Sequence, residues 1–118
     1  MNTADADERR RQPRITLKQL AQAMGRDFET GEPSEVMGTT ADISEGGVRF
    51  EAERGFKEGS QVSISFSVGE EIIEAVGQVV HFTPREDGAV SMGLKFVNLS
   101  ESDQRFIENF CRSRTEPA

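Results

Sequence analysis

The sequence predicts an all-β domain, either a small antiparallel barrel or a sandwich, with one helix at its C-terminal end. Residues 61–68 alternate strictly between polar and apolar side chains, which is typical of a half-buried strand. Turn-forming Gly, Pro and Asp residues separate five or six such short runs between residues 36 and 97. Valine outnumbers leucine by nine to four, which favours strands over helices. A chain of 118 residues provides one domain of this kind.

The individual strands follow from the positions of the turns. We expect strands over residues 36–44, 48–52, 61–68, 72–82 and 89–97. The connecting turns carry Gly, Pro or acidic residues and fall at residues 45–47, 69–71 and 84–88. Residues 26–34 have the Gly, Pro and acidic content of a loop.

The segment before this loop, residues 15–28, is ambiguous. Apolar side chains recur in it at a spacing closer to that of a helix, at Leu17, Leu20, Ala21 and Met24. Gly25 is a typical residue at the end of such a helix. The start of the first strand therefore stays open.

The C-terminal segment, residues 100–114, has the period of an amphipathic helix. Ser100 and Asp103 resemble a capping box at its start. Its apolar face consists of Phe106, Ile107, Phe110 and Cys111. We expect this face to cover one end of the barrel.

The charge balance limits the possible partners. Acidic residues outnumber basic residues by 21 to 14, which gives a net charge of −7. Proteins that wrap nucleic acid or coat anionic membranes present a basic face, so we expect neither nucleic acid nor membrane insertion. No apolar run approaches the length of a membrane span. The single cysteine, Cys111, cannot form an intrachain disulfide, which is typical of proteins in the reducing cytoplasm.

Catalytic and metal-binding chemistry finds little support in the sequence. His81 is the only histidine and stands at the end of an apolar run, so no His/Cys cluster has metal-ligand spacing. Cys111 lies on the apolar face of the predicted helix, where cysteine usually packs as a small hydrophobic residue. Gly46 and Gly47 are not followed by the Lys-Ser/Thr pair of a phosphate loop. We therefore expect no catalytic residue, no metal and no cofactor.

Residues 1–14 form a polar arm with no apolar period, which we expect to be flexible and unpacked in the free protein. Its arginines are Arg9, Arg10, Arg11 and Arg14. A solvated basic arm is the simplest interpretation. The exclusive use of arginine also fits a ligand-binding arm, because the planar guanidinium binds phosphate, pairs with the Hoogsteen edge of guanine and stacks on rings.

A second polar cluster, made by Asp42, Ser44, Gly46 and Gly47, surrounds the first predicted turn. Ordinary turn chemistry accounts for these residue types. Asp42 and Ser44 are two residues apart on a strand, however, and so point to the same side of the sheet. Gly47 can adopt a positive φ or let a ligand approach the backbone. The cluster thus offers a carboxylate acceptor, a hydroxyl and bare amide groups.

Together these two clusters resemble the motifs of PilZ domains. Residues 10–14, RRQPR, are similar to the RRxxR motif of that family, and residues 42–47, DISEGG, are similar to its (D/N)xSxxG motif. Residues 77–81 and 92–100 resemble later strands of the family, so the resemblance covers about residues 8–110. Residues 15–28 depart from it, because family members generally run straight into a first strand there.

The resemblance implies a six-stranded antiparallel β-barrel over residues 15–99, with the arm at residues 1–14 and the helix at residues 100–114. It implies a receptor for cyclic di-GMP that changes conformation on binding and signals through an unidentified partner protein. The implied ligand-binding residues are Arg9, Arg10, Arg11, Arg14, Asp42, Ser44, Gly46 and Gly47.

Two other functions stay open beside this one. The first is a PilZ-like adaptor that does not bind nucleotide, and the second is a small barrel that binds nucleic acid through its arm. In the family, an arginine just before the R-x-x-x-R spacing is associated with a stacked pair of ligands. Arg9 occupies that place, which implies two cyclic di-GMP molecules per chain.

Overall fold

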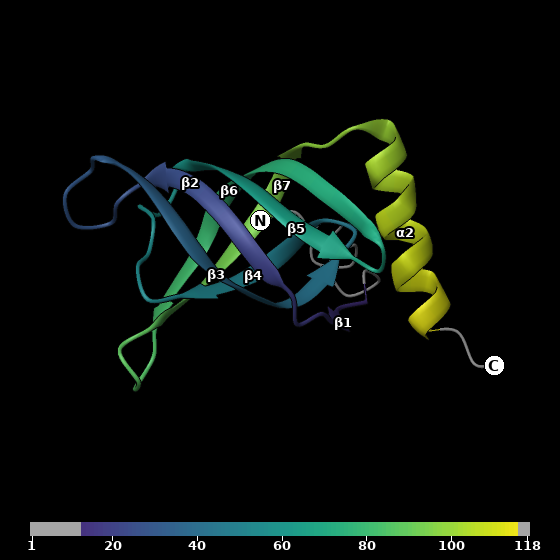
Figure 1. The fold of residues 1–118 in the computed structure, drawn as a ribbon, viewed down its shortest axis with the longest axis horizontal. Helices are drawn as coiled ribbons and strands as arrows, with labels where there is room; N and C mark the ends of the chain where they lie inside the picture. Colours follow the sequence, from purple (N-terminus) through teal and green to yellow (C-terminus); the bar gives the residue numbers. More distant parts are fainter. Residues whose placement is uncertain (1–12, 116–118) are drawn as a thin grey trace, which may run out of the picture.

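The computed structural model of the protein describes residues 13–115. These residues form the strands β1 (Ile15–Thr16), β2 (Leu20–Arg26), β3 (Pro33–Ser44), β4 (Gly47–Ala52), β5 (Gln61–Val68), β6 (Glu71–Pro84) and β7 (Val90–Asn98), followed by the helix α2 (Glu101–Thr115) (Figure 1).

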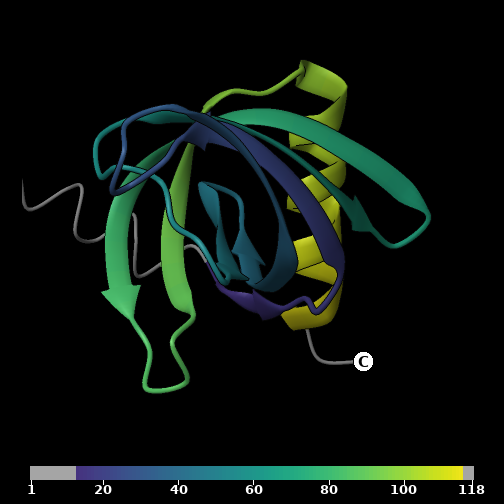
Figure 2. The same ribbon diagram turned by 60° about the vertical axis from the view of Figure 1, so that its left-hand side comes forward.

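Six of the strands close into an antiparallel barrel. Their order around the ring is β3, β2, β5, β6, β7 and β4, and the pairing of β4 with β3 closes it. β1 is a short extra strand paired with the C-terminal half of β3. The loop of the β6–β7 hairpin extends beyond the body of the barrel (Figure 2). The predicted fold, a six-stranded antiparallel barrel with a C-terminal helix, is confirmed for the part of the chain that the structure describes.

Residues 15–28, whose conformation the sequence leaves open, contain the strands β1 and β2 and no helix. In β2, Ala21 and Ala23 are 2% and 0% exposed, whereas Leu20 and Met24 are 72% and 55% exposed. Every second residue is therefore buried, as in a strand with one face on the core. The spacing of the large apolar residues resembles that of a helix only because Leu20 and Met24 face solvent, while the small residues Ala21 and Ala23 face the interior.

The other strands lie close to their predicted positions. β5 has the predicted bounds, and β6 and β7 differ from them by one or two residues at each end. β3 begins at Pro33, inside the expected loop at residues 26–34. β4 begins at Gly47, one residue before its expected start, which leaves a turn of only two residues after Ser44.

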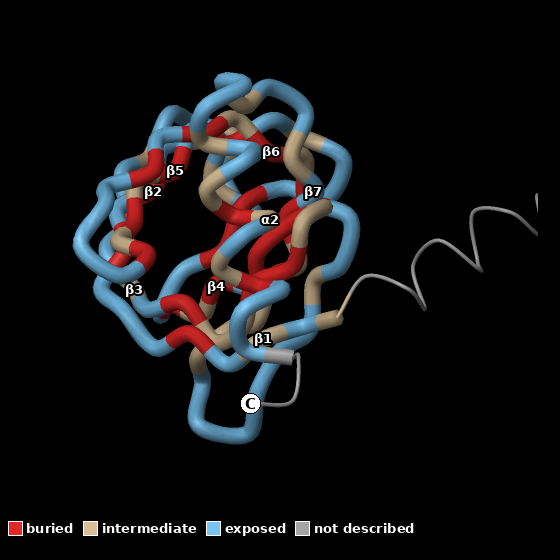
Figure 3. The backbone as a smooth tube through the Cα atoms, turned by 90° about the vertical axis from the view of Figure 1, so that its right-hand side faces the viewer, coloured by how far each residue is buried: buried red, intermediate tan, exposed pale blue. Residues whose placement is uncertain are grey.

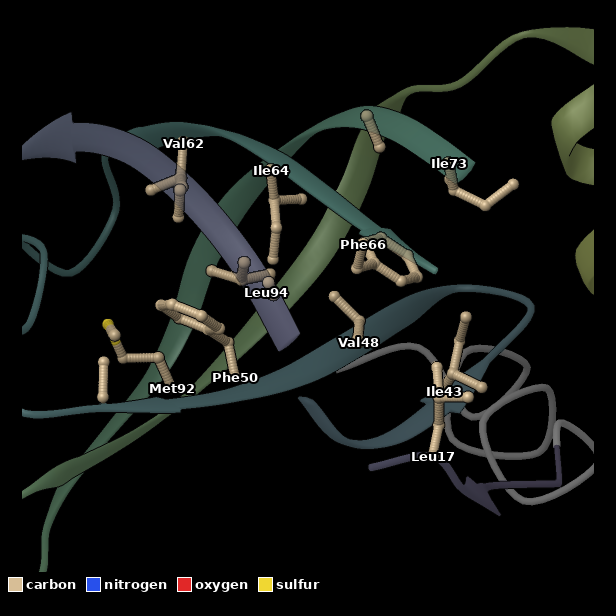
Figure 4. Packing of buried hydrophobic residues seen from close by; sticks show 14 of the residues in the cluster. Leu17, Ile43, Val48, Phe50, Val62, Ile64, Phe66, Ile73, Met92 and Leu94 are labelled. Atoms are coloured by element: carbon tan, nitrogen blue, oxygen red, sulfur yellow. The ribbon is translucent and has the colours of Figure 1, made fainter. Parts of the chain in front are cut away.

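The core fills the interior of the ring. Buried segments occur in strands all around the ring (Figure 3). The largest buried side chains include Phe50, Phe66 and Met92, none more than 2% exposed, and Phe50 and Met92 lie close together (Figure 4). Burying such side chains contributes about 1.5–3 kcal/mol each. The barrel is thus held by a continuous apolar interior, which leaves its outer wall available for polar side chains.

The helix α2 covers one end of the barrel, as predicted (Figure 1). Its own residues Ile107 and Cys111 are fully buried, and they belong to the same apolar cluster as the strand side chains. The Ser100 hydroxyl accepts a hydrogen bond from the backbone N–H of Asp103 at 3.1 Å, which caps the first turn. No helix within residues 13–115 combines the length and the apolar character needed to cross a bilayer.

Gly47 lies close to the backbone of β7, where it pairs with Lys95. A Cβ atom at this position would lie 2.2 Å from the carbonyl oxygen of Leu94. Gly47 is not among the glycines with positive φ in residues 13–115, so the first of the two roles considered for it, a left-handed conformation, does not apply. The glycine is required by the neighbouring strand, because a side chain would push β4 away from β7 and open the barrel.

We predict that Gly47→Ala lowers the free energy of unfolding by about 2 kcal/mol or more, since the atom in the way is backbone and cannot turn aside. Gly93→Ala is the matched control, because a Cβ on Gly93 would meet the exposed imidazole of His81 at 3.2 Å, and that ring can rotate away. Urea denaturation of both variants measures the difference. Equal stability of the two variants would contradict the packing role of Gly47.

Candidate functional site

The short strand β1 brings the end of the arginine motif to the barrel. Ile15 pairs with Ile43 and Thr16 pairs with Asp42. The backbone N–H of Leu17 continues this pairing with a hydrogen bond to the carbonyl oxygen of Ala41 at 3.0 Å. Residue 14 therefore emerges directly beside the C-terminal end of β3.

Arg14, Asp42 and Arg49 form a charged cluster on the outer wall of the barrel. The Nε and Nη2 atoms of Arg14 lie 2.7 and 2.5 Å from Oδ1 of Asp42. The Nε atom of Arg49 lies 3.2 Å from the other carboxylate oxygen, Oδ2. Each oxygen of Asp42 thus faces one guanidinium. The expectation that the whole arginine arm is unpacked in the free protein is therefore wrong for Arg14.

The cluster is accessible to solvent. The side chains of Arg14 and Arg49 are 46% and 49% exposed, and that of Asp42 is 22% exposed. Ion pairs at this exposure contribute at most about 1 kcal/mol each, because water screens them. The arrangement therefore positions two guanidinium groups and one carboxylate at the surface, and it contributes little to holding the barrel together.

The turn between β3 and β4 lies next to this cluster. Ser44 is 3% exposed, and its hydroxyl accepts a hydrogen bond from the backbone N–H of Gly46 at 3.3 Å. The carbonyl oxygen of Gly46 accepts a hydrogen bond from the backbone N–H of Phe96 at 2.9 Å, which ties the turn to β7. In this structure Ser44 and the two glycines hold the turn in place.

The structure places some of the predicted site residues next to one another. It brings Arg14 onto Asp42, and it places Ser44, Gly46 and Gly47 in the adjoining turn. The remaining predicted ligand-binding residues, Arg9, Arg10 and Arg11, lie outside the described residues.

Arg49 is the site residue that the sequence analysis missed. The predicted three-residue turn at 45–47 places Phe50 opposite Asp42 by register, whereas the observed turn pairs Ser44 with Gly47 and Asp42 with Arg49. In Val48-Arg49-Phe50 the charged residue stands between two apolar residues, so the alternation of a strand places Arg49 on the outer face of the barrel. Only a turn of two residues places Arg49 opposite Asp42, and the sequence analysis expected a turn of three.

Cys111 on α2 contacts β3, the strand that carries Asp42 and Ser44. Its Sγ lies 4.0 Å from the carbonyl oxygen of Ile43, to which the thiol donates. Burial raises the pKa of the Cys111 thiol, the negative charge of Glu45 raises it further, and the positive charge of Arg14 opposes the shift. The thiol therefore stays protonated near neutral pH, which suits a packing residue and not a nucleophile. Within residues 13–115, no group of three or more His, Cys, Asp or Glu side chains could hold a metal ion.

We predict that the Arg14–Asp42 pair is weakly coupled in stability. A double-mutant cycle with Arg14→Ala and Asp42→Ala should give a coupling of about 1 kcal/mol or less in urea denaturation, because both side chains are partly exposed. The solvent-exposed helix pair Glu101 and Arg105, whose closest approach is 3.3 Å, provides the control cycle. A coupling of about 3 kcal/mol or more would instead make the pair a structural element of the barrel.

Comparison with known proteins agrees with this fold. The PilZ domain family model matches residues 8–113. No curated protein matches the chain significantly. Among solved structures, the inhibitor of motility MotI/DgrA of Bacillus subtilis is similar with a TM-score of 0.71 and 19% identity, over 87% of this chain and 49% of that chain.

Two further structures contain cyclic di-GMP. The PilZ domain of YcgR from Escherichia coli is similar with a TM-score of 0.65 and 18% identity, over 89% of this chain and 90% of that domain. MrkH of K. pneumonia, as a complex, is similar with a TM-score of 0.62 and 18% identity, over 88% of this chain and 50% of that chain. The chain thus spans about half the length of MotI and MrkH.

At these identities the likeness to solved structures concerns the fold. The family match covers nearly the whole chain, from residue 8 to residue 113, and it includes both motifs and the helix. The chain belongs to the PilZ domain family.

Proposed function

We propose that this chain is a non-catalytic receptor for cyclic di-GMP. The observation that carries the proposal is the contact between Arg14 and Asp42, which joins the two family motifs at one accessible point on the barrel. The family and the cyclic di-GMP present in the similar YcgR and MrkH structures support the identity of the ligand.

The chemistry of the cluster suits both parts of this ligand. Arginine guanidinium groups form charge-assisted hydrogen bonds with phosphate, each contributing about 1.5–3 kcal/mol. Arg14 supplies one such group, and we propose that Arg9, Arg10 and Arg11 supply others. The carboxylate of Asp42 can accept hydrogen bonds from the N–H groups of a guanine edge. Ser44, Gly46 and Gly47 contribute by fixing the turn that carries Asp42.

The signal, in this proposal, is an ordering of the arginine segment over the barrel, which creates a new surface for an effector protein. A protein partner fits better than nucleic acid, because the chain has a net charge of −7. A cytoplasmic location suits a chain whose single cysteine is a buried packing residue. These features belong to the proposal together with the ligand.

We predict that Arg14→Ala and Asp42→Ala each weaken cyclic di-GMP binding by about 2 kcal/mol, because each removes charge-assisted hydrogen bonds. Isothermal titration calorimetry measures the change. Arg105→Ala is the matched control, since Arg105 lies on α2 away from the cluster, with its side chain 74% exposed and paired with Glu101. The control variant should bind like the wild type.

The competing function, an adaptor that does not bind nucleotide, gives a different outcome. It predicts no binding heat for the wild type at any accessible ligand concentration. Equal binding by wild type, Arg14→Ala and Asp42→Ala would show instead that the ligand binds elsewhere on the chain.

The stoichiometry is a separate prediction, and it concerns Arg9, which lies outside the described residues. We propose two cyclic di-GMP molecules per chain, because two stacked ligands carry four phosphate charges, and an additional guanidinium helps to neutralise these charges and can stack on a base. Arg9→Leu should lower the ratio towards one while Arg10 and Arg14 stay intact. Calorimetry with an independently measured concentration of active protein gives the ratio. A wild-type ratio of one, unchanged in Arg9→Leu, would contradict the role of Arg9 and leave the receptor function in place.

A further inference from the structure

Exposed apolar side chains gather on the outer wall that β3, β2, β5 and β6 form side by side (Figure 1). Leu20 and Met24 of β2 are 72% and 55% exposed, and Met37 of the neighbouring β3 is 60% exposed. Every second residue of β2 between Leu20 and Met24 is a buried alanine, so these two side chains share the outer face. Met37 pairs with Gln22, which lies between them on the same face. The three apolar side chains therefore surround one point of the wall.

An open groove of about 450 Å³ lies over β5, beside this apolar group. Its lining includes Ser63 and Ser65, whose short side chains leave space between the longer residues of β2 and β6. Met24 lines the groove from β2, and Glu74 and Val76 line it from β6. The register agrees with this order, because Met24 pairs with Ser63 and Ser63 pairs with Val76. Ligand sites have volumes of about 300–1,000 Å³, so the groove has room for a few side chains of a partner.

The charged groups of this wall are acidic. Glu74 lines the groove, and within residues 13–115 it takes part in no ion pair or side-chain hydrogen bond. Glu35 on β3 accepts a hydrogen bond from the side-chain amide of Gln22, so its carboxylate lies over β2. Arg26, at the end of β2, donates to the carbonyl oxygen of Gly31 in the β2–β3 loop at 3.0 Å. The wall thus combines exposed apolar side chains with carboxylates that have no cationic partner among the described residues.

These features distinguish between the possible occupants of the wall. Soluble domains seldom leave a contiguous apolar group exposed unless it binds something. A second copy of this chain would bring two sets of the carboxylates Glu35 and Glu74 together, and like charges are unfavourable at an interface. An anionic membrane surface is repelled for the same reason. A protein segment with Lys or Arg beside apolar side chains complements both features, and flexible methionine side chains adapt to such segments.

We propose that this wall is the docking surface for an effector protein that presents a segment of apolar side chains flanked by Lys or Arg. An apolar side chain of the segment enters the groove over β5, between Met24 and Val76, and a neighbouring cationic group pairs with Glu74. Leu20 and Met37 cover further apolar side chains of the segment. The inference rests on the proposed function, which requires an effector protein, and it adds the surface and the chemistry of that partner.

Selection from a random dodecapeptide library displayed on phage tests the chemistry of the partner. The wild-type protein, with and without cyclic di-GMP, is the bait. The double variant Met24→Ser, Glu74→Lys removes peptides that bind elsewhere. We expect the retained sequences to combine large apolar residues with Lys or Arg and to lack Asp and Glu. Retained sequences rich in acidic residues, or no sequence that distinguishes the two baits, would overturn the proposal.

Single substitutions locate the retained peptide on the wall. Fluorescence anisotropy with the synthetic peptide should show an affinity about tenfold weaker for Glu74→Lys and about fivefold weaker for Met24→Ser than for the wild type. Glu86→Lys, in the exposed β6–β7 turn, changes the net charge equally, and Val80→Ser replaces an apolar residue that is 38% exposed outside the groove. Both controls should stay within about twofold of the wild type, and unfolding curves verify the fold of all variants. Equal losses in Glu74→Lys and Glu86→Lys would reduce the attraction to net charge and overturn the proposal.

Calorimetry with cyclic di-GMP separates this surface from the ligand site. Met24→Ser and Glu74→Lys should bind cyclic di-GMP like the wild type, because neither residue belongs to the Arg14–Asp42 cluster. Peptide binding by a wild-type protein that does not bind cyclic di-GMP would refute the ligand part of the proposed function and leave the docking surface in place. Cyclic di-GMP binding without any peptide binding would refute the docking surface alone.

Two measurements test the other occupants of the wall. A dimer in sedimentation velocity that Met24→Ser dissociates would assign the wall to a second copy of the chain. A synthetic peptide with the sequence of residues 1–12 that displaces the selected peptide at equal concentration would assign the wall to that segment. Either result would overturn the proposal, which expects a monomer at this wall and no displacement.

Discussion

The path of β3 is the constraint on which both the barrel and the candidate site depend. Along one edge, β3 pairs with β2 over its first half and with β1 near its end, and along the other edge it pairs with β4. Because β4 also pairs with β7, the register of the β3–β4 hairpin decides whether the ring closes. The same register sets Asp42 opposite Arg49, and β1 delivers Arg14 to the same point. Closure of the fold and assembly of the charged cluster are therefore two results of one set of backbone pairings.

The net charge of the chain conceals an uneven distribution around the barrel. Next to Arg14 at the edge of β3, β4 and β7 present Arg49 and Lys95, and the same wall carries acidic residues in other rows, Glu51 on β4 and Glu71 and Glu74 on β6. The wall of β3, β2 and β5 instead presents exposed apolar residues, among them Leu20 at 72% exposure. Charges act over about 8–10 Å at physiological ionic strength, so an approaching phosphate responds to the nearby wall. A net charge of −7 therefore does not argue against an anionic ligand at this position.

The sequence predicts this fold well where the pattern of burial is local. The alternation of residues 61–68 and the turn residues around it locate β5 and its neighbours, and the apolar stripe locates α2. The same pattern does not predict β2, because its core-facing residues are alanines and its large residues face solvent. The motifs predict Arg14 and Asp42 as partners in one site. They do not reveal Arg49, because its position opposite Asp42 depends on the register of the β3–β4 pair, and one residue more or less in the turn or a bulge changes that register.

The ion pairs of Asp42 also bear on how a ligand enters the site. In the free protein its two carboxylate oxygens face Arg14 and Arg49, so a guanine edge that reaches Asp42 has to displace at least one guanidinium. Breaking a partly exposed ion pair costs at most about 1 kcal/mol, whereas a new charge-assisted bond to phosphate contributes about 1.5–3 kcal/mol. The exchange is therefore favourable whenever base and phosphate arrive on the same molecule. Free guanine alone would pair with the carboxylate of Asp42 and leave the displaced guanidinium unpaired. Free phosphate alone would pair with the guanidinium and leave the carboxylate unpaired. In the proposed function, the cluster thus holds its arginine in place without ligand and would favour a ligand in which a guanine and a phosphate are covalently joined.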